Sequence, residues 1–329
     1  RSRGSSKSPV EPPPSVAERP AMFRTGLFSY ILWAACTMVL IQAFPPQPAS
    51  ASTPLNVVVT LPVLKDWVQQ VGGPNVQVLS LMTGYENEHT YAPKPSDLVA
   101  VRKARLLFEV GAGLEVWVAS LVKNAGNAGL KVVTTSRGIE LIPDHQDAHE
   151  DGHHGHGGSG NPHMWLDPES ATAMVRSIAE ALIAADPDHS SEYRTRTDSY
   201  LRDLKQVQQE TMERMRRVPH RRIIVHHPAW PYFAKRYDIQ VAGTILIQPG
   251  GEPSPRHLSS LIATMKRDHV TVVVSESQLN QKVPQLLARE TGARVVILTT
   301  LPGGLPGTET YLDMLRYNVV QLAEALERT

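Results

Sequence analysis

Short apolar runs alternate with segments of helical spacing along this chain, and that alternation restricts the possible folds more than any other feature. In the first half, strand-like runs lie at residues 55–60, 76–82, 105–110 and 131–135. Helix-like segments lie between them, at residues 62–72, 96–103 and 114–124. Strands that are apolar throughout are typical of a parallel sheet covered by helices on both faces. This half is therefore predicted to form an α/β lobe.

The same alternation returns in the second half. Strand-like runs lie at residues 222–225, 240–247, 270–275 and 294–298, and helix-like segments at 229–237, 255–267, 282–291 and 310–328. Between the halves, residues 168–185 predict one helix and residues 186–217 a longer, highly charged one. About thirty helical residues span about 45 Å, the length of a domain. We therefore expect two similar lobes with mostly parallel sheets, at 54–185 and 218–329, joined by one connecting helix over 186–217, with a ligand cleft between them.

The first 53 residues are expected to be an N-terminal extension and a secretory signal peptide. An apolar run at 27–44 follows a short basic start, and Ala49-Ser50-Ala51 fits a cleavage site. Two alternatives stay open. The run approaches the ~18–20 apolar residues of a membrane span, so it could remain as an anchor, and Cys36 could carry a lipid. In each case the protein is expected outside the cytoplasm, and a periplasmic location is favoured.

Composition excludes some kinds of partner and site. The chain has 33 Lys and Arg against 32 Asp and Glu, and this balance gives no indication of nucleic-acid binding. Cys36 is the one cysteine. A disulfide framework and a zinc site built on several cysteines are therefore excluded.

A histidine-rich tract occupies residues 144–160. Its histidines lie among Asp, Glu and Gly, at positions His145, His149, His153, His154 and His156. A tract of this composition has no apolar face to bury, so it is expected to be a loop that binds divalent metal weakly. The alternative is a solvated insertion without a role in metal binding.

Three other histidines each come shortly before a predicted helix: His89, His163 and His227. In parallel sheets, such junctions lie at the edge where ligands bind. Three imidazoles from separate segments suit Zn(II), which prefers four ligands in tetrahedral geometry. A single histidine is more often a surface or core residue, so the indication of a metal site comes from the set.

The motifs around these histidines resemble those of the metal-binding solute-binding proteins of zinc and manganese ABC importers, the zinc branch in particular. They read E-H-x-Y-x-x-x-P-S-D at 88–97, N-P-H-x-W-L-D-P at 161–168, H-x-A-W-x-Y-F-A at 227–234, G-G-E-P-S at 250–254 and T-Y-L-D-M-L-R-Y-N at 310–318. The resemblance covers the chain from about residue 55 to its end. It implies two lobes joined by a long rigid helix, one metal in the cleft, delivery to a membrane permease, and a monomer.

The resemblance also implies that His89, His163 and His227 hold the metal. Manganese members commonly have a carboxylate where this chain has His227, and imidazole suits Zn(II) better than Mn(II). Family members commonly supply an aspartate from a segment of the second lobe, where Thr299 stands here. The fourth ligand is therefore left open, with Glu88 favoured and a water molecule as the alternative.

Two neighbours of these residues are assigned other roles. Glu276 matches a family glutamate near the site and is expected to orient a ligand imidazole through a hydrogen bond. His226 is expected to point away from His227 and not to bind metal. The resemblance further implies that the histidine-rich tract captures zinc at low affinity or docks a zinc chaperone.

The predicted function is capture of Zn(II) and its delivery to an ABC-type import permease, and the chain is not expected to be an enzyme. A manganese-binding member or an adhesin of the same fold is one alternative. A zinc hydrolase is another, because three histidines and an open position can also form a catalytic site. The one H-E-x-x-H spacing of the sequence, at 149–153, falls in the histidine-rich tract, which is expected to be a loop and not the helix that this motif needs.

Overall fold

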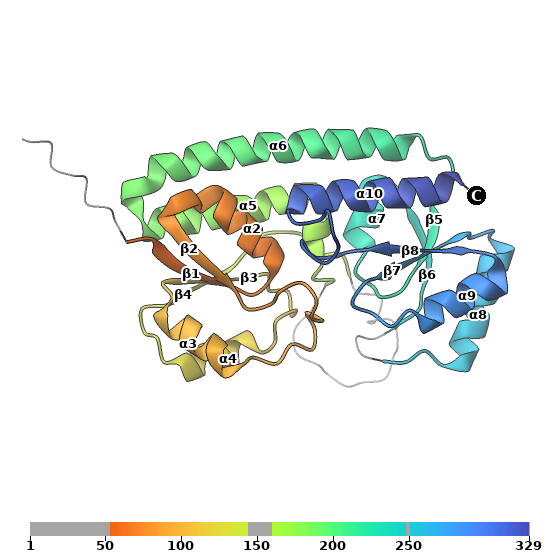
Figure 1. The fold of residues 1–329 in the computed structure, drawn as a ribbon, viewed down its shortest axis with the longest axis horizontal. Helices are drawn as coiled ribbons and strands as arrows, with labels where there is room; N and C mark the ends of the chain where they lie inside the picture. The colour runs from red at the N-terminus through yellow and green to blue at the C-terminus, as the bar shows by residue number, and fades with distance from the viewer. Residues whose placement is uncertain (1–52, 144–159, 248–250, 329) are drawn as a thin grey trace, which may run out of the picture. The chain divides into compact units, whose positions relative to one another are not determined.

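The computed structural model describes residues 53–143, 160–247 and 251–328, which belong to one unit, Thr53–Thr329 (Figure 1). The predicted signal peptide with Cys36 and the five histidines of the tract lie outside these ranges. Within these ranges, no helix has the length and apolar character needed to cross a membrane.

The first lobe is built on four parallel strands. They are β1 (Leu55–Val59), β2 (Val76–Ser80), β3 (Leu106–Glu109) and β4 (Lys131–Thr134), in the order β2-β1-β3-β4. Its helices are α2 (Pro62–Gly72), α3 (Pro95–Lys103) and α4 (Val118–Ala125). The order reverses between β1 and β3, and in such sheets the ligand crevice lies outside the carboxyl ends of the strands at that point.

The second lobe repeats this topology. Its strands are β5 (Arg222–Val225), β6 (Gln240–Thr244), β7 (Val272–Glu276) and β8 (Arg294–Leu298), in the order β6-β5-β7-β8. Its helices are α7 (Pro231–Tyr237), α8 (Pro255–Arg267), α9 (Lys282–Thr291) and α10 (Tyr311–Glu327). In both lobes the second strand along the chain is outermost and the first lies beside the third. The prediction of two similar lobes with parallel sheets is confirmed.

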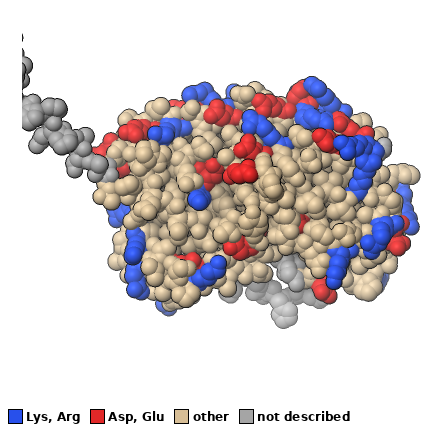
Figure 2. All heavy atoms as spheres, in the orientation of Figure 1, with Lys and Arg blue, Asp and Glu red and all other residues tan. Residues whose placement is uncertain are grey.

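One long helix joins the lobes, and it follows a helix that packs on the first lobe. Helix α5 (Pro168–Ala185) is followed by a 3-10 turn (Pro187–His189) and by the long helix α6 (Ser190–Arg216), which passes both sheets (Figure 1). One face of α6 is buried, through residues that include Tyr193, Leu204 and Met215, and it packs on α2, α5 and α10. Basic and acidic side chains are interspersed along the α6 and α10 edge (Figure 2), where Arg214 pairs with Glu327.

A few boundaries differ from the predicted ones. Helix α4 begins at Val118 instead of residue 114, because the Glu115 carboxylate accepts hydrogen bonds from the backbone of Val110 and Gly111 and from the Thr60 hydroxyl. These bonds hold the preceding residues in a turn. The connecting helix begins at Ser190 instead of residue 186, and strand β6 ends at Thr244 instead of residue 247.

Candidate metal centre

The loop between β2 and α3 carries Glu88 and His89. At the end of this loop, the Tyr91 hydroxyl donates to Asp97 Oδ2 at 2.7 Å, and the backbone N–H of Lys94 donates to the same oxygen at 2.7 Å. Tyr91 is buried. This buried bond network fixes the end of the loop next to the start of α3 and so restricts where Glu88 and His89 can lie.

His163 lies in the segment that leads into α5, directly before a 3-10 turn (Met164–Leu166). Asn161 Oδ1 accepts a hydrogen bond from the backbone N–H of His163 at 3.0 Å and lies 3.0 Å from its Nδ1. Pro168 then starts α5 with Asp167 as the N-cap residue, which accepts from the backbone N–H groups of Glu169 and Ser170. The position of His163 is thus fixed by the bonds of Asn161 before it and by the capped start of α5 after it.

His227 follows β5 with one residue between them, at the carboxyl end of the second sheet. Glu276 ends the neighbouring strand β7, and its Oε1 lies 3.3 Å from His227 Nδ1. The indole Nε1 of Trp230 donates to the same oxygen at 2.6 Å. Glu276 is fully buried, so its carboxylate acts on His227 with little screening by water.

The fold brings Glu88, His89, His163 and His227 together from three separate segments. Each residue offers one possible ligand atom, and these four atoms all lie within 4.8 Å of one another. Among the described residues, no other group of His, Cys, Asp and Glu side chains is arranged so that it could hold a metal ion. The Nε2 atoms of His89 and His163 are 3.2 Å apart. Glu88 Oε1 lies 3.5 Å from His163 Nε2. The prediction that these four residues converge agrees with this geometry.

Two atoms of the group are buried without a hydrogen-bond partner. They are Glu88 Oε1 and His227 Nε2, in residues that are only 1% and 5% exposed. Buried polar atoms in proteins nearly always have a partner, and an exception calls for an explanation. A cation shared by the four side chains would satisfy both atoms. Because Glu88 is buried, it is not simply a loop carboxylate that faces solvent.

The charges within the group favour a cation. Burial raises the pKa of Glu88, but contact with His163 and the charges of the other two imidazoles outweigh it and bring the pKa to about 2. Burial and the neighbouring imidazoles lower the pKa of His89 to about 4 and also lower that of His163. At neutral pH the group therefore offers an ionised carboxylate and two neutral imidazoles.

His227 differs from the other two histidines. Burial lowers its pKa, but the hydrogen bond to Glu276 and the charges of Glu276 and Glu88 outweigh burial, and the net shift is upward. A metal bound at Nε2 needs the neutral ring. There is therefore a range of pH in which His89 is already neutral but His227 still carries a proton that a metal ion would have to displace.

Two nearby residues do not join the group. Thr299 is buried, but its hydroxyl donates to the Leu301 carbonyl at 2.7 Å and so closes its own turn. His226 Nδ1 lies 2.7 Å from the Ser275 hydroxyl. Sequence reasoning did not assign roles to Asn161 and Trp230, although both lie inside the histidine motifs, two residues before His163 and three after His227.

Comparison with known proteins identifies the family of this chain and agrees with its fold. The family described as zinc-uptake complex component A, periplasmic, matches residues 57–325. The high-affinity zinc uptake system protein of Bacillus subtilis is 27% identical over 279 residues, which are 83% of this chain and 88% of that protein. The manganese-binding lipoprotein of Halalkalibacterium halodurans is 26% identical over 279 residues, 83% of this chain and 89% of that one.

A solved structure shows the same arrangement of the two lobes. The crystal structure of ZnuA superimposes with a TM-score of 0.74 and 29% sequence identity, over 83% of this chain and all of that one. The resemblance inferred from the sequence motifs is thereby confirmed. This chain belongs to the periplasmic zinc-uptake complex component A family, whose members are metal-binding substrate-binding proteins of ABC transporters.

Proposed function

We propose that this protein captures Zn(II) outside the cytoplasm and delivers it to the membrane permease of an ABC importer. The observation that carries the proposal is the group of Glu88, His89, His163 and His227, with two buried atoms that lack partners. Three nitrogen donors and one carboxylate oxygen match the four-coordinate geometry that Zn(II) prefers. The metal is the cargo of this protein, so it must be bound tightly and later released.

The donor set favours zinc over manganese. Relatives of this chain carry names for zinc, manganese and iron binding, so family membership alone does not select the metal. Manganese prefers carboxylate oxygen, whereas imidazole suits zinc. The group contains one carboxylate and three imidazoles, and the Thr299 hydroxyl, at the position of the family aspartate, bonds to Leu301 instead.

Glu88 is the proposed fourth ligand, in preference to water. It is 1% exposed, and its pKa of about 2 keeps it ionised at every physiological pH. The proposed role of Glu276 is to accept a hydrogen bond from His227 Nδ1, which leaves Nε2 free for the metal. The histidine-rich tract is proposed to capture zinc at low affinity or to dock a zinc chaperone.

Zinc titration in competition with a chromogenic chelator tests the proposal. The proteins are the mature chain, a version lacking residues 145–156, His163→Ala, and His257→Ala as a control. His257 is a half-buried histidine of the second lobe outside the group, and its Nε2 bonds to the Thr244 carbonyl. We expect His163→Ala to lose the tight site and His257→Ala to keep it. The version lacking residues 145–156 should lose only weak sites.

The reverse pattern would contradict the proposal. If the tight site survives His163→Ala and disappears with residues 145–156, the tract is the binding element and the cleft is not. Competition between equal concentrations of Zn(II) and Mn(II) tests the metal. A preference for Mn(II) would overturn the zinc assignment.

A further inference from the structure

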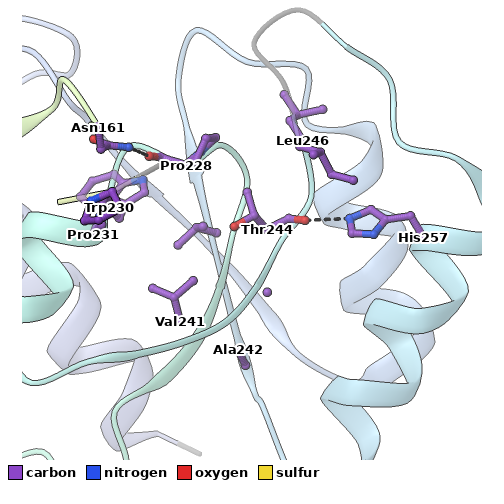
Figure 3. A pocket seen from close by; sticks show the side chains of 13 residues that line it. Asn161, Pro228, Trp230, Pro231, Val241, Ala242, Thr244, Leu246 and His257 are labelled. Carbon is purple, nitrogen blue, oxygen red and sulfur yellow. Dashed lines mark hydrogen bonds between the residues drawn. The ribbon is translucent and has the colours of Figure 1, made fainter. Parts of the chain in front are cut away.

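The side chain of Asn161 contacts the segments of two proposed metal-binding histidines. Its Nδ2 donates to the Pro228 carbonyl at 2.6 Å (Figure 3). Its Oδ1 accepts from the backbone N–H of His163 at 3.0 Å and lies 3.0 Å from His163 Nδ1. Asn161 is only 3% exposed, so water cannot easily replace these partners.

These contacts determine which nitrogen of His163 carries the proton. A carbonyl oxygen can only accept, so the Asn161 amide must present its NH2 group to Pro228 and its oxygen to His163. That oxygen also can only accept, and therefore His163 Nδ1 must be the protonated nitrogen. The lone pair is then on Nε2, the atom that lies 3.2 Å from His89 Nε2 and 3.5 Å from Glu88 Oε1. This is the tautomer that a metal at the centre requires.

The same side chain also fixes the position of His163 relative to His227. Pro228 directly follows His227, so the Asn161–Pro228 bond ties the segment of His163 to that of His227 across 67 positions of sequence. The Tyr232 hydroxyl reinforces the tie by donating to the Asn161 carbonyl at 2.8 Å. Arg236, one turn further along α7, bonds to Asp167. His163 and His227 are thus joined through bonds that do not involve the loop of Glu88 and His89.

We infer that Asn161 is a positioning residue of the metal centre, which sets the tautomer of His163 and its placement relative to His227. The effect on affinity rests on the proposed function, whereas the effect on the tautomer can be observed without metal. Residues that orient a metal-binding imidazole typically contribute about 10–100-fold to metal affinity.

Two variants separate the contacts of Asn161. Asn161→Leu removes both the donor to Pro228 and the acceptor for His163. Asn161→Asp keeps an acceptor for His163 but has no hydrogen to donate to Pro228. The control is Asn127→Leu, because Asn127 also accepts from a backbone N–H two residues on, at Gly129, and donates to distant carbonyls, at Val101 and Ala104.

Nitrogen-15 NMR of the metal-free protein, labelled at histidine, reports the tautomer, and chelator competition reports zinc affinity. We expect the Nδ1–H form of His163 in the wild type, its loss in Asn161→Leu, and its retention in Asn161→Asp. Zinc affinity should fall by about 10–100-fold in Asn161→Leu and by less in Asn161→Asp. Asn127→Leu should leave the tautomer and the affinity unchanged.

Three results would overturn the inference. One is an unchanged tautomer and affinity in Asn161→Leu, and another is an equal loss of affinity in Asn127→Leu, which would indicate a general structural effect. The third is loss of the Nδ1–H form of His163 in Asn161→Asp, a variant that also allows the test if Asn161→Leu does not fold. A wild type that binds no zinc tightly would instead refute the proposed function, because the tautomer measurement needs no metal.

Discussion

At the scale of single residues, two buried carboxylates account for the charge of the proposed centre. Glu88 belongs to the metal-binding group, and Glu276 lies behind His227. A buried charge is costly unless an opposite charge offsets it. In their ionised forms the two carboxylates would balance one divalent cation when the three imidazoles are neutral. A further aspartate at the position of Thr299 is therefore not needed for neutrality.

Replacing Glu88 by glutamine tests its role as a ligand, since the shape is kept and the charge is lost. Unit charges about 4 Å apart interact by about 4 kcal/mol at an effective dielectric constant of 20. We therefore expect Glu88→Gln to weaken zinc binding by at least about 100-fold in chelator competition. Glu86→Gln is the control, because Glu86 lies in the same loop but bonds to Thr83. Wild-type affinity in Glu88→Gln would favour water as the fourth ligand.

Zinc affinity should depend on pH through His227 first. Its raised pKa means that the metal-free protein keeps this proton to a pH above the ordinary value of 6.5. Binding is therefore strongest above that pKa and should weaken by about tenfold for each unit of pH below it, as one proton is displaced. The loss should steepen near pH 4, where His89 is protonated, while Glu88 stays ionised with its pKa of about 2.

Competition titrations between pH 8 and pH 4, corrected for protonation of the chelator, measure this dependence. His257→Ala, which lies outside the metal-binding group, should show the same profile as the wild type. Affinity that stays constant from pH 8 to pH 5 would show that His227 does not bind the metal as a neutral ring.

At the scale of elements, the start of α5 is joined to α7. Asp167 accepts hydrogen bonds from the first backbone N–H groups of α5, and it also pairs with Arg236 of α7, whose Nε lies 2.5 Å from Asp167 Oδ1. Arg236 contacts Glu169 as well. Asp167 comes four residues after His163, so this junction holds the segment of His163 against the second lobe.

Loss of this junction should lower the free energy of unfolding. Arg236→Met removes a charged hydrogen-bond partner and should cost about 1–3 kcal/mol. Asp167→Ala removes that pair and the N-cap and should cost about 2–4 kcal/mol. Urea unfolding curves of the metal-free proteins provide the measurement.

The control for this comparison is Arg267→Met. Arg267 pairs with its neighbour Asp268 at an exposed site, and such pairs contribute little to stability. An effect of Arg236→Met no larger than that of Arg267→Met would show that the α5–α7 junction is not a significant source of stability.

At the scale of the whole described unit, helices tie the two lobes in more than one place. Helix α6 packs on helices of both lobes, and Tyr311 at the start of α10 reaches the first lobe. The ring of Tyr311 packs edge-on against Trp67 of α2 at a centroid distance of 4.9 Å, and its backbone N–H donates to Asp66. Its hydroxyl donates to the Trp165 carbonyl at 2.6 Å. Large hinge motion would break these buried contacts.

We therefore expect only small movement of the lobes on metal binding. Small-angle scattering profiles of the metal-free and zinc-loaded protein should coincide within error. Thermal or urea unfolding is the loading control, because zinc at about 1,000 times its dissociation constant should add about 4 kcal/mol to the free energy of unfolding. A clear decrease in the radius of gyration of the loaded protein would contradict this expectation.

The elements were predictable because the signals that specify them are local. The helices at 62–72, 168–185, 255–267 and 282–291 begin and end where the sequence indicates. Proline occupies the first turn of α2, α5 and α8, where it lacks only an N–H that the helix does not use. Gly292 ends α9 with a φ of 74°, a conformation that glycine adopts without strain. The start of α4 was missed because the bond from Thr60 to Glu115 crosses 55 positions.

The candidate site shows the same division. The residue types and motifs of the sequence were enough to single out Glu88, His89, His163 and His227. The burial of Glu88, the proton position on His163 and the upward pKa shift of His227 were not readable from it. These properties depend on Pro228 facing Asn161 and on Glu276 facing His227, pairs that are 67 and 49 residues apart. Periodicity and capping act between near neighbours, whereas burial and protonation depend on residues that meet only after the chain has folded.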